Sequence, residues 1–212
     1  MAHNSKYVKI LNSEEWYNLI SNQYKKHHSH LDSFLNLEIS RFLPRKHENL
    51  DIIDLGAGDG RIFKHFENIN FRKYVACDIA EKLLEKHPKQ WIKVQKIVCD
   101  LNKKLSFDDE SFDIATSFFV LEHIKNLEWL FEEVYRILKN GGKRIIGHFI
   151  QRREFEWEHW KWKEHIKFKI QQYRYKLEDL KKIAEYNFFN FKYQEIVGKW
   201  VLIGYLIVCE KN

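Results

Sequence analysis

Three glycines at alternating positions follow a short run of β-forming residues, and they point more directly to chemistry than any other part of the chain. The run covers Ile52 to Leu55, and the glycines that follow it are Gly56, Gly58 and Gly60. A helical pattern over 60–67 comes next. Because glycine has no Cβ, a turn built from it brings free main-chain N–H groups within reach of a ligand. The segment therefore predicts a strand–turn–helix unit that holds a cofactor, without saying which cofactor.

Three aspartates stand at or near the ends of predicted strands. Asp54 precedes the glycine turn, Asp78 lies 22 residues after Gly56, and Asp100 ends the next strand-like run. An acidic residue about 20 residues beyond such a turn is placed to accept hydrogen bonds from ribose hydroxyls. A carboxylate at Asp100 could accept from the exocyclic amine of an adenine. Because carboxylates at this density would repel a pyrophosphate, the set favours a nucleoside ligand without a phosphate.

Each aspartate also has a simpler interpretation. Asp54 could brace the loop, Asp78 could cap a helix that begins at Ile79, and Asp100 could be an ordinary loop residue. The glycine turn has a rival interpretation as the site of a nicotinamide or flavin enzyme. That fingerprint needs G-x-G-x-x-G, whereas here the glycines alternate and Arg61 follows the last of them, so we disfavour it.

Strand-like and helical stretches alternate from residue 51 onward, which implies a mostly parallel sheet covered on both faces. The last two strand runs are separated by two residues, and this spacing predicts an antiparallel hairpin. Earlier in the chain, Asn12 can cap a helix whose third residue is Glu15, and a second helix carries Leu31 to Phe42. The predicted strands are 51–55, 73–77, 92–99, 112–119, 143–150, 191–197 and 200–209, and the later helices are 60–67, 79–86, 126–139 and 176–186.

Bulk composition is that of one soluble globular domain covering residues 1–212, with 44% hydrophobic and 31% charged residues. The net charge of +6 comes mostly from lysines interleaved with acids, a pattern of solvated helix faces rather than of a nucleic-acid interface. No apolar run approaches the roughly 20 residues needed to span a bilayer, and no signal segment follows Met1. We therefore expect a cytoplasmic protein, with Cys77, Cys99 and Cys209 as buried thiols.

Five stretches, taken in order, resemble one known family. They are 51–60, 77–78, 99–113, 117–124 and 133–142. Each is weak alone, but together and at this spacing they resemble the class I S-adenosylmethionine-dependent methyltransferases, specifically the type 11 or UbiE-like small-molecule group. The resemblance implies a Rossmann-like three-layer α/β/α sandwich. Its sheet would have seven mostly parallel strands and an antiparallel C-terminal hairpin strand. Ser106 and Asn140 stand where the family usually has proline.

The resemblance also implies how S-adenosylmethionine would be held. The backbone from Gly56 to Gly58 would approach its methionine part, and Asp78 would bind the ribose. Phe118 and Phe119 would lie near the sulfonium. Ile79 would lie against the adenine, and Asp100 with Leu101 would recognise the adenine edge. The predicted cofactor residues are Asp54, Gly56, Ala57, Gly58, Asp78, Ile79, Asp100, Leu101, Phe118 and Phe119.

Methyl transfer is an in-line displacement at a carbon activated by positive sulfur, so the enzyme chiefly orients the reactants and can remove a proton from the acceptor. The candidate bases are Glu122, His123 and His148, at or beyond the ends of the fourth and fifth predicted strands, together with Tyr24. Each histidine could instead only pack or cap a loop. The product would be S-adenosylhomocysteine.

Several subclasses and a metal site are disfavoured. Ser117 and the two phenylalanines replace the Pro-Pro-aromatic turn of amino-methylating nucleobase enzymes, and no cysteine follows a proline as in cytosine-C5 enzymes. Ser117 also stands where magnesium-dependent catechol-type enzymes place an aspartate. His27, His28 and His30 are too crowded for three ligands of one metal, so we predict none.

The stretch 151–173 combines tryptophans with charge. We expect it to form a lid over the site together with the N-terminal helices of residues 1–48. Trp157 and Trp160 would shape the acceptor pocket, and Arg152 would favour an anionic group. These rings could also merely pack the insertion onto the body. The hypothesis is a small-molecule acceptor, partly apolar or anionic, and a monomer or homodimer. The alternatives are an inactive binding or scaffold protein and an RNA-directed methyltransferase.

Overall fold

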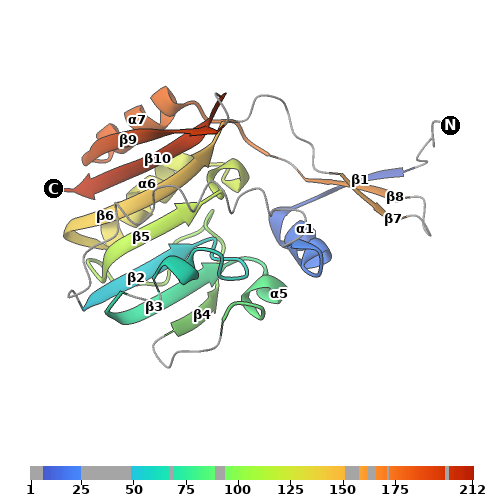
Figure 1. Ribbon diagram of the computed structural model, residues 1–212, viewed down its shortest axis with the longest axis horizontal. Helices are drawn as coiled ribbons and strands as arrows, with labels where there is room; N and C mark the ends of the chain where they lie inside the picture. Colours follow the sequence, from blue (N-terminus) through green and yellow to red (C-terminus); the bar gives the residue numbers. More distant parts are fainter. Residues whose placement is uncertain are drawn as a thin grey trace.

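The computed structural model describes residues 7–24, 49–66, 69–88, 94–150, 158–161, 166–170, 172–198 and 201–212. Its body is a seven-stranded sheet of order β4-β3-β2-β5-β6-β10-β9 (Figure 1). The strands are β2 (Leu50–Leu55), β3 (Phe71–Asp78), β4 (Val94–Val98), β5 (Phe112–Phe118), β6 (Leu138–Phe149), β9 (Phe189–Gly198) and β10 (Val201–Lys211). The first five pair in parallel, and β10 pairs antiparallel with both β6 and β9. The predicted sheet and its C-terminal hairpin strand are thereby confirmed.

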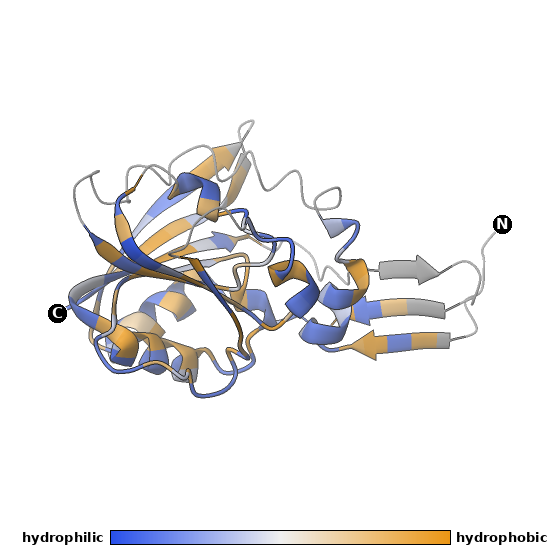
Figure 2. Cartoon of the chain, turned by 90° about the horizontal axis from the view of Figure 1, so that it is seen from below, coloured by the Kyte–Doolittle hydropathy of each residue, from blue (hydrophilic) through white to orange (hydrophobic). Residues whose placement is uncertain are grey.

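Both faces of this sheet are buried. On one face, α6 (Leu127–Ile137) and α7 (Leu177–Tyr186) pack against side chains such as Ile53 and Val75. On the other face, residues 57–66 and Leu84 of the short helix α5 (Glu81–Leu84) cover Ile52 and its neighbours. Figure 2 shows the hydrophobic colour running along the strands, while the connecting loops are largely hydrophilic. Among the described residues, no helix has the length and apolar character needed to cross a membrane.

The predicted helix over 60–67 is wrong. The described part of it, up to Phe66, holds only a 3₁₀ turn, η1 (Phe63–His65). Gly60 has φ +85°, a left-handed conformation that does not continue into an α-helix. The following main-chain hydrogen bonds, such as Phe63 N–H to Gly60 O at 3.1 Å, span three residues rather than four. An α-helix and a 3₁₀ turn both place residues three apart on a similar face, so the spacing of Ile62, Phe63 and Phe66 does not distinguish the two conformations.

A second, three-stranded sheet of order β1-β8-β7 lies beside the body, with α1 (Ser13–Ile20) next to it (Figure 1). Its strands are β1 (Tyr7–Leu11), β7 (Glu158–Lys161) and β8 (Ile166–Ile170). Leu11, Trp16 and Phe168 belong to a small core of their own, so the N-terminal segment and the late insertion do pack together. The Asn12–Glu15 capping box of α1 is confirmed. The predicted helix over 31–42 lies outside the described residues.

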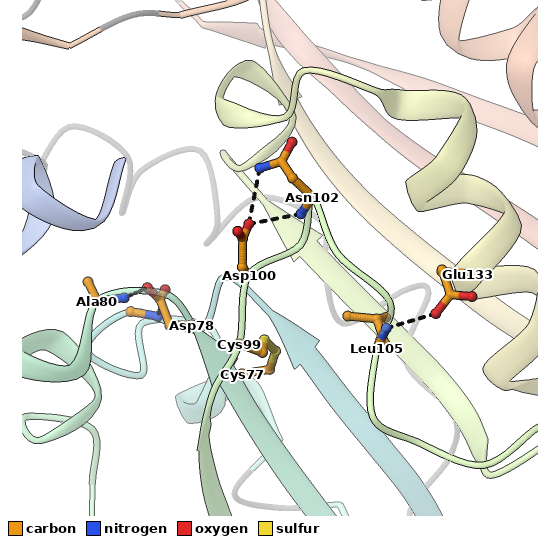
Figure 3. Close-up of a disulfide and its surroundings, with 9 residues drawn as sticks. Cys77, Asp78, Ala80, Cys99, Asp100, Asn102, Leu105 and Glu133 are labelled. Carbon is orange, nitrogen blue, oxygen red and sulfur yellow. Dashed lines mark hydrogen bonds between the residues drawn. A yellow bond between two sulfur atoms is a disulfide. The ribbon is translucent and has the colours of Figure 1, made fainter. Parts of the chain in front are cut away.

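The expectation of three free thiols is wrong for two of them. Cys77 is the penultimate residue of β3 and Cys99 follows β4. These adjacent strands place the two Cα atoms 5.8 Å apart, and the cysteines form a disulfide (Figure 3). Sequence spacing hid this pairing because the cysteines are 22 residues apart. Cys209 is free and buried, as expected.

Candidate active site

The strand order reverses at β2, because β3 and β4 lie on one side of it and β5 and β6 on the other. Ligands of such sheets bind beyond the carboxyl ends of the strands at this point. A pocket opens there, which we call the strand-end pocket. It is lined by Ser13, Tyr17, Tyr24, Gly56, Asp78, Ile79, Leu83, Cys99, Asp100, Leu101, Asn102, Phe118, Phe119, Val120, His123 and Ile124.

The glycine turn allows close packing and does not offer free donors at its first three amides. Gly56 has φ +80°, and a Cβ on it would lie 2.2 Å from Cγ2 of Val120. Its N–H and that of Ala57 donate to the carbonyl of Cys77 at 2.7 and 3.0 Å, and Gly58 N–H donates to Asp78. The expectation of free N–H groups is therefore wrong for these three amides. The missing side chain at Gly56 is required by the close packing of Val120.

Asp78 connects the turn to the start of α5. Its Oδ2 accepts the Gly58 N–H and its Oδ1 accepts the Ala80 N–H, both at 2.8 Å. Burial raises the pKa of this carboxyl above its ordinary value, and the main-chain hydrogen bonds oppose that rise. A carboxylate offers about four acceptor sites, so Asp78 can also accept from a ligand in the pocket.

Asp100 lies on the neighbouring loop, as Figure 3 shows. Its Oδ1 accepts from the main-chain and side-chain nitrogens of Asn102, at 3.0 and 3.2 Å. Asn102 in turn accepts the Lys125 N–H at 3.0 Å, which fixes this loop to the segment after β5. Asn102 is a pocket residue that the sequence reasoning missed.

Asp54 does not reach the strand-end pocket. It is buried beneath the glycine turn, where its carboxylate accepts from Tyr74 Oη at 2.9 Å and Thr116 Oγ1 at 2.6 Å. Burial raises its pKa to about 6, against the lowering effect of both hydroxyls. The simpler interpretation, in which Asp54 braces the loop, fits this geometry.

Phe118 and Phe119 form the wall at the end of β5. A Cβ on Gly147 would lie 2.2 Å from the Phe118 ring, so the adjacent strand β6 can carry no side chain at that position. Phe119 has φ +58°, an uncommon conformation for a residue with a side chain, and it packs edge-on to Phe149 with ring centroids 5.6 Å apart. The turn after β5 is thus held in one conformation beside the pocket.

Tyr17 and His123 meet inside the pocket. The Tyr17 hydroxyl lies 2.7 Å from His123 Nε2, and the two rings stand edge to face at 5.2 Å. His123 belongs to the 3₁₀ turn η2 (Leu121–His123), and Tyr17 belongs to α1. Tyr24 lies 5.9 Å from the Tyr17 ring, and burial raises the pKa of both phenols. Sequence reasoning missed Tyr17, although its seven-residue spacing from Tyr24 is a helical signal.

The other two candidate bases lie outside the pocket wall. Burial raises the pKa of Glu122 to about 7, and its main-chain carbonyl accepts the Tyr173 N–H at 2.7 Å. His148 is buried with Nε2 2.9 Å from the Tyr175 carbonyl. The strand-end pocket therefore brings together His123 and Tyr24 but not Glu122 and His148.

The proposed lid residues are mostly beyond what the structure describes. Arg152 and Trp157 lie outside the described residues, and only the main chain of Trp160 is described, within β7. The histidines at 27, 28 and 30 also lie outside. In the described ranges, no three His, Cys, Asp or Glu side chains gather as metal ligands would.

Comparison with known proteins finds similar methyltransferases. Residues 53–146 match the family model described as a methyltransferase domain. The chain is 30% identical over 128 residues to a sterol 4-C-methyltransferase of Caenorhabditis elegans, covering 57% of this chain and 38% of that protein. It is 30% identical over 140 residues to a demethylmenaquinone methyltransferase of Leptospira interrogans, covering 60% and 56%. The matched parts thus span about half of these relatives or less.

Solved structures share the fold. Phosphoethanolamine N-methyltransferase 2 of Haemonchus contortus, in complex with S-adenosyl-L-methionine, superposes with a TM-score of 0.65 at 18% identity, over 84% of this chain and 52% of that one. The matched motifs, the strand order and the acidic strand ends agree with one another. Residues 53–146 thus match a methyltransferase domain, and the fold is that of S-adenosylmethionine-dependent methyltransferases.

Proposed function

We propose that this protein transfers the methyl group of S-adenosylmethionine to a small-molecule acceptor. The observation that carries the proposal is a single pocket at the switch point of the sheet that holds both parts of such a site. One part is the bare glycine turn with Asp78 and Asp100, and the other is the hydrogen-bonded pair of Tyr17 and His123.

The donor half fits S-adenosylmethionine by its chemistry. Asp78 keeps acceptor capacity for ribose hydroxyls, and Asp100 offers a carboxylate to the exocyclic amine of adenine. Ile79 and Leu101 line the pocket with apolar side chains that can contact the adenine ring. The rings of Phe118 and Phe119 suit a positively charged sulfur, because aromatic faces attract cations. S-adenosylmethionine supplies an electrophilic methyl group at that sulfur.

The acceptor half would position a hydroxyl or amine and take its proton. Tyr17 and His123 share one short hydrogen bond, so the imidazolium that forms when His123 takes the acceptor's proton can donate from Nε2 to the phenol oxygen of Tyr17. Because α1 carries Tyr17 over the pocket, this helix also helps to exclude water from the acceptor. We place the base role on His123, with Tyr17 holding its ring, rather than on Glu122 or His148.

The names of relatives support a small-molecule acceptor. One relative is named for methylation of a sterol and another for methylation of demethylmenaquinone, and both of these acceptors are small molecules. We carry this class over to the present chain as a proposal, together with the lid roles of Arg152, Trp157 and Trp160 and a cytoplasmic location. An inactive scaffold and an RNA-directed enzyme remain outcomes of the tests below.

The test has two stages. Calorimetric titration of the wild type with S-adenosylmethionine and S-adenosylhomocysteine should show saturable binding, and its absence would overturn the donor half. Methyl-labelled S-adenosylmethionine is then offered with quinols, sterols, small amines and RNA in parallel. Transfer to one of the small molecules supports the acceptor class, transfer to RNA alone refutes it, and binding without transfer to any of them favours the scaffold.

A further inference from the structure

The Cys77–Cys99 disulfide lies between the segments that form the donor half of the pocket. Cys77 directly precedes Asp78 and Cys99 directly precedes Asp100. The disulfide therefore links the two residues next to these aspartates (Figure 3). The Cα separation of 5.8 Å is ordinary for a disulfide. In the paired register of β3 and β4, Cys77 lies opposite Ile97 and Asp78 opposite Val98, and Cys99 follows directly after this pairing.

Main-chain hydrogen bonds extend this connection to the glycine turn. The Cys77 carbonyl accepts the N–H groups of Gly56 and Ala57, and the Cys99 N–H donates to the Asp78 carbonyl at 2.9 Å. The disulfide therefore ties together the turn, the Asp78 strand end and the Asp100 loop. A change in this bond acts on all three at once.

The two sulfurs differ in access. Cys77 is completely buried, whereas Cys99 is partly exposed and lines the strand-end pocket. A small thiolate can thus reach the disulfide at Cys99 through the pocket, and a nucleoside ligand seated there would cover it. Disulfides found in reducing compartments are usually catalytic or redox-sensing rather than structural.

We propose that Cys77 and Cys99 form a reversible thiol–disulfide site through which small thiols and disulfides such as glutathione set the affinity of the donor pocket. The proposal rests on the proposed function, since it concerns the S-adenosylmethionine site. The disulfide form holds Asp78 and Asp100 at a fixed spacing and binds more tightly, because a ligand then meets a preorganised site. Reduction frees the Asp100 loop and weakens binding.

The exchange balances without any group beyond the named thiols. A glutathione thiolate attacks Cys99 Sγ, the S–S bond breaks, and Cys77 leaves as a thiolate that takes up a proton. A second glutathione thiolate attacks the glutathione sulfur of the mixed disulfide and releases Cys99 with oxidised glutathione. Two thiols are oxidised as the protein disulfide is reduced, and oxidised glutathione drives the reverse reaction.

The experiment compares S-adenosylhomocysteine affinity after equilibration with oxidised or reduced glutathione, with the redox state verified by thiol labelling and mass spectrometry. We expect the reduced wild type to bind about 5-fold or more weakly, in the usual range of coupling between sites. Cys99→Ser should bind like the reduced form under both conditions. Cys209→Ala, which removes the buried free thiol, should respond like the wild type.

Linkage supplies a second readout. If redox state changes the affinity by a given factor, bound S-adenosylhomocysteine must shift the thiol–disulfide equilibrium by the same factor. It should also slow the reduction of the wild type by covering Cys99. Equal affinity in both redox states, or failure of the disulfide to form with oxidised glutathione, overturns this proposal alone. No binding in either state overturns the proposed function as well.

Discussion

The N–H of Gly58 donates to Oδ2 of Asp78 over 2.8 Å, so the glycine turn and the carboxylate at the end of β3 form one unit. Asp78 also accepts the Ala80 N–H, which joins that unit to the start of α5. The residue proposed to bind ribose therefore also sets the shape of the turn proposed to receive the methionine part. A substitution here acts on the ligand contact and on the turn together.

Replacement of Asp78 by alanine should weaken S-adenosylhomocysteine binding by about 10- to 150-fold, the effect of losing a hydrogen bond to a charged group. Calorimetric titration measures this change. Glu85→Ala is the matched control, because Glu85 is an exposed acid just after α5 and does not line the pocket. Equal affinity of the Asp78 variant and the wild type would contradict the assigned role.

The Tyr17–His123 pair should affect turnover rather than cofactor affinity. We expect His123→Ala to lower kcat by about 100-fold, as loss of a general base does. Tyr17→Phe should lower it by up to about tenfold, the effect of one hydrogen bond. Initial rates of methyl transfer to the identified acceptor test this, with S-adenosylhomocysteine affinity measured alongside. Tyr186→Phe is the control, since Tyr186 is exposed on α7. A Tyr17 variant with wild-type turnover would remove the tyrosine from the mechanism.

The sheet and half of the site could be predicted from the sequence because they depend on local patterns. Buried strands appear as runs of β-forming residues, and parallel strands bring their carboxyl ends to one edge, so Asp78 and Asp100 were found from their positions alone. The helix predicted over 126–139 is observed as α6, Leu127–Ile137, because its apolar stripe and its Asn126 cap agree. Here propensity, period and capping all favoured the same structure.

The rest depends on contacts between distant residues. The Tyr17–His123 hydrogen bond joins residues 106 positions apart, and the pairing of β1 with β8 joins the N-terminal segment to the insertion. No local pattern reports such partners. Asp54 was assigned to the ligand because it stands beside the glycines, but alternation of side chains along β2 turns it toward Tyr74 and Thr116 instead.

Glycine substitutions should separate backbone strain from steric exclusion. Gly56 and Gly141 have similar φ values, +80° and +73°, but a Cβ on Gly56 would meet Val120 at 2.2 Å whereas one on Gly141 would meet nothing within 4 Å. We expect Gly141→Ala to cost about 1–2 kcal/mol of unfolding free energy. Gly56→Ala should cost about 1–3 kcal/mol more, from overpacking, and should weaken S-adenosylhomocysteine binding. Urea denaturation and calorimetry measure both effects, and equal losses in the two variants would show that the Val120 contact is unimportant.

His87 should make the fold sensitive to acid. It is buried, with its ring 5.2 Å from that of Phe63, and burial lowers its pKa to about 4. In the unfolded chain a histidine has a pKa of about 6.5. Between these two pH values the histidine is protonated in the unfolded chain but not in the folded protein. The free energy of unfolding therefore falls as the pH is lowered from about 6.5 to about 4.

His87→Phe keeps an apolar ring in place and removes the titration, so its Tm should fall several degrees less than that of the wild type across this pH range. Thermal unfolding followed by circular dichroism at pH 7 and pH 4.5 measures the difference. Tyr186→Phe should keep the wild-type dependence, and parallel Tm curves for the wild type and His87→Phe would show that the acid sensitivity lies elsewhere.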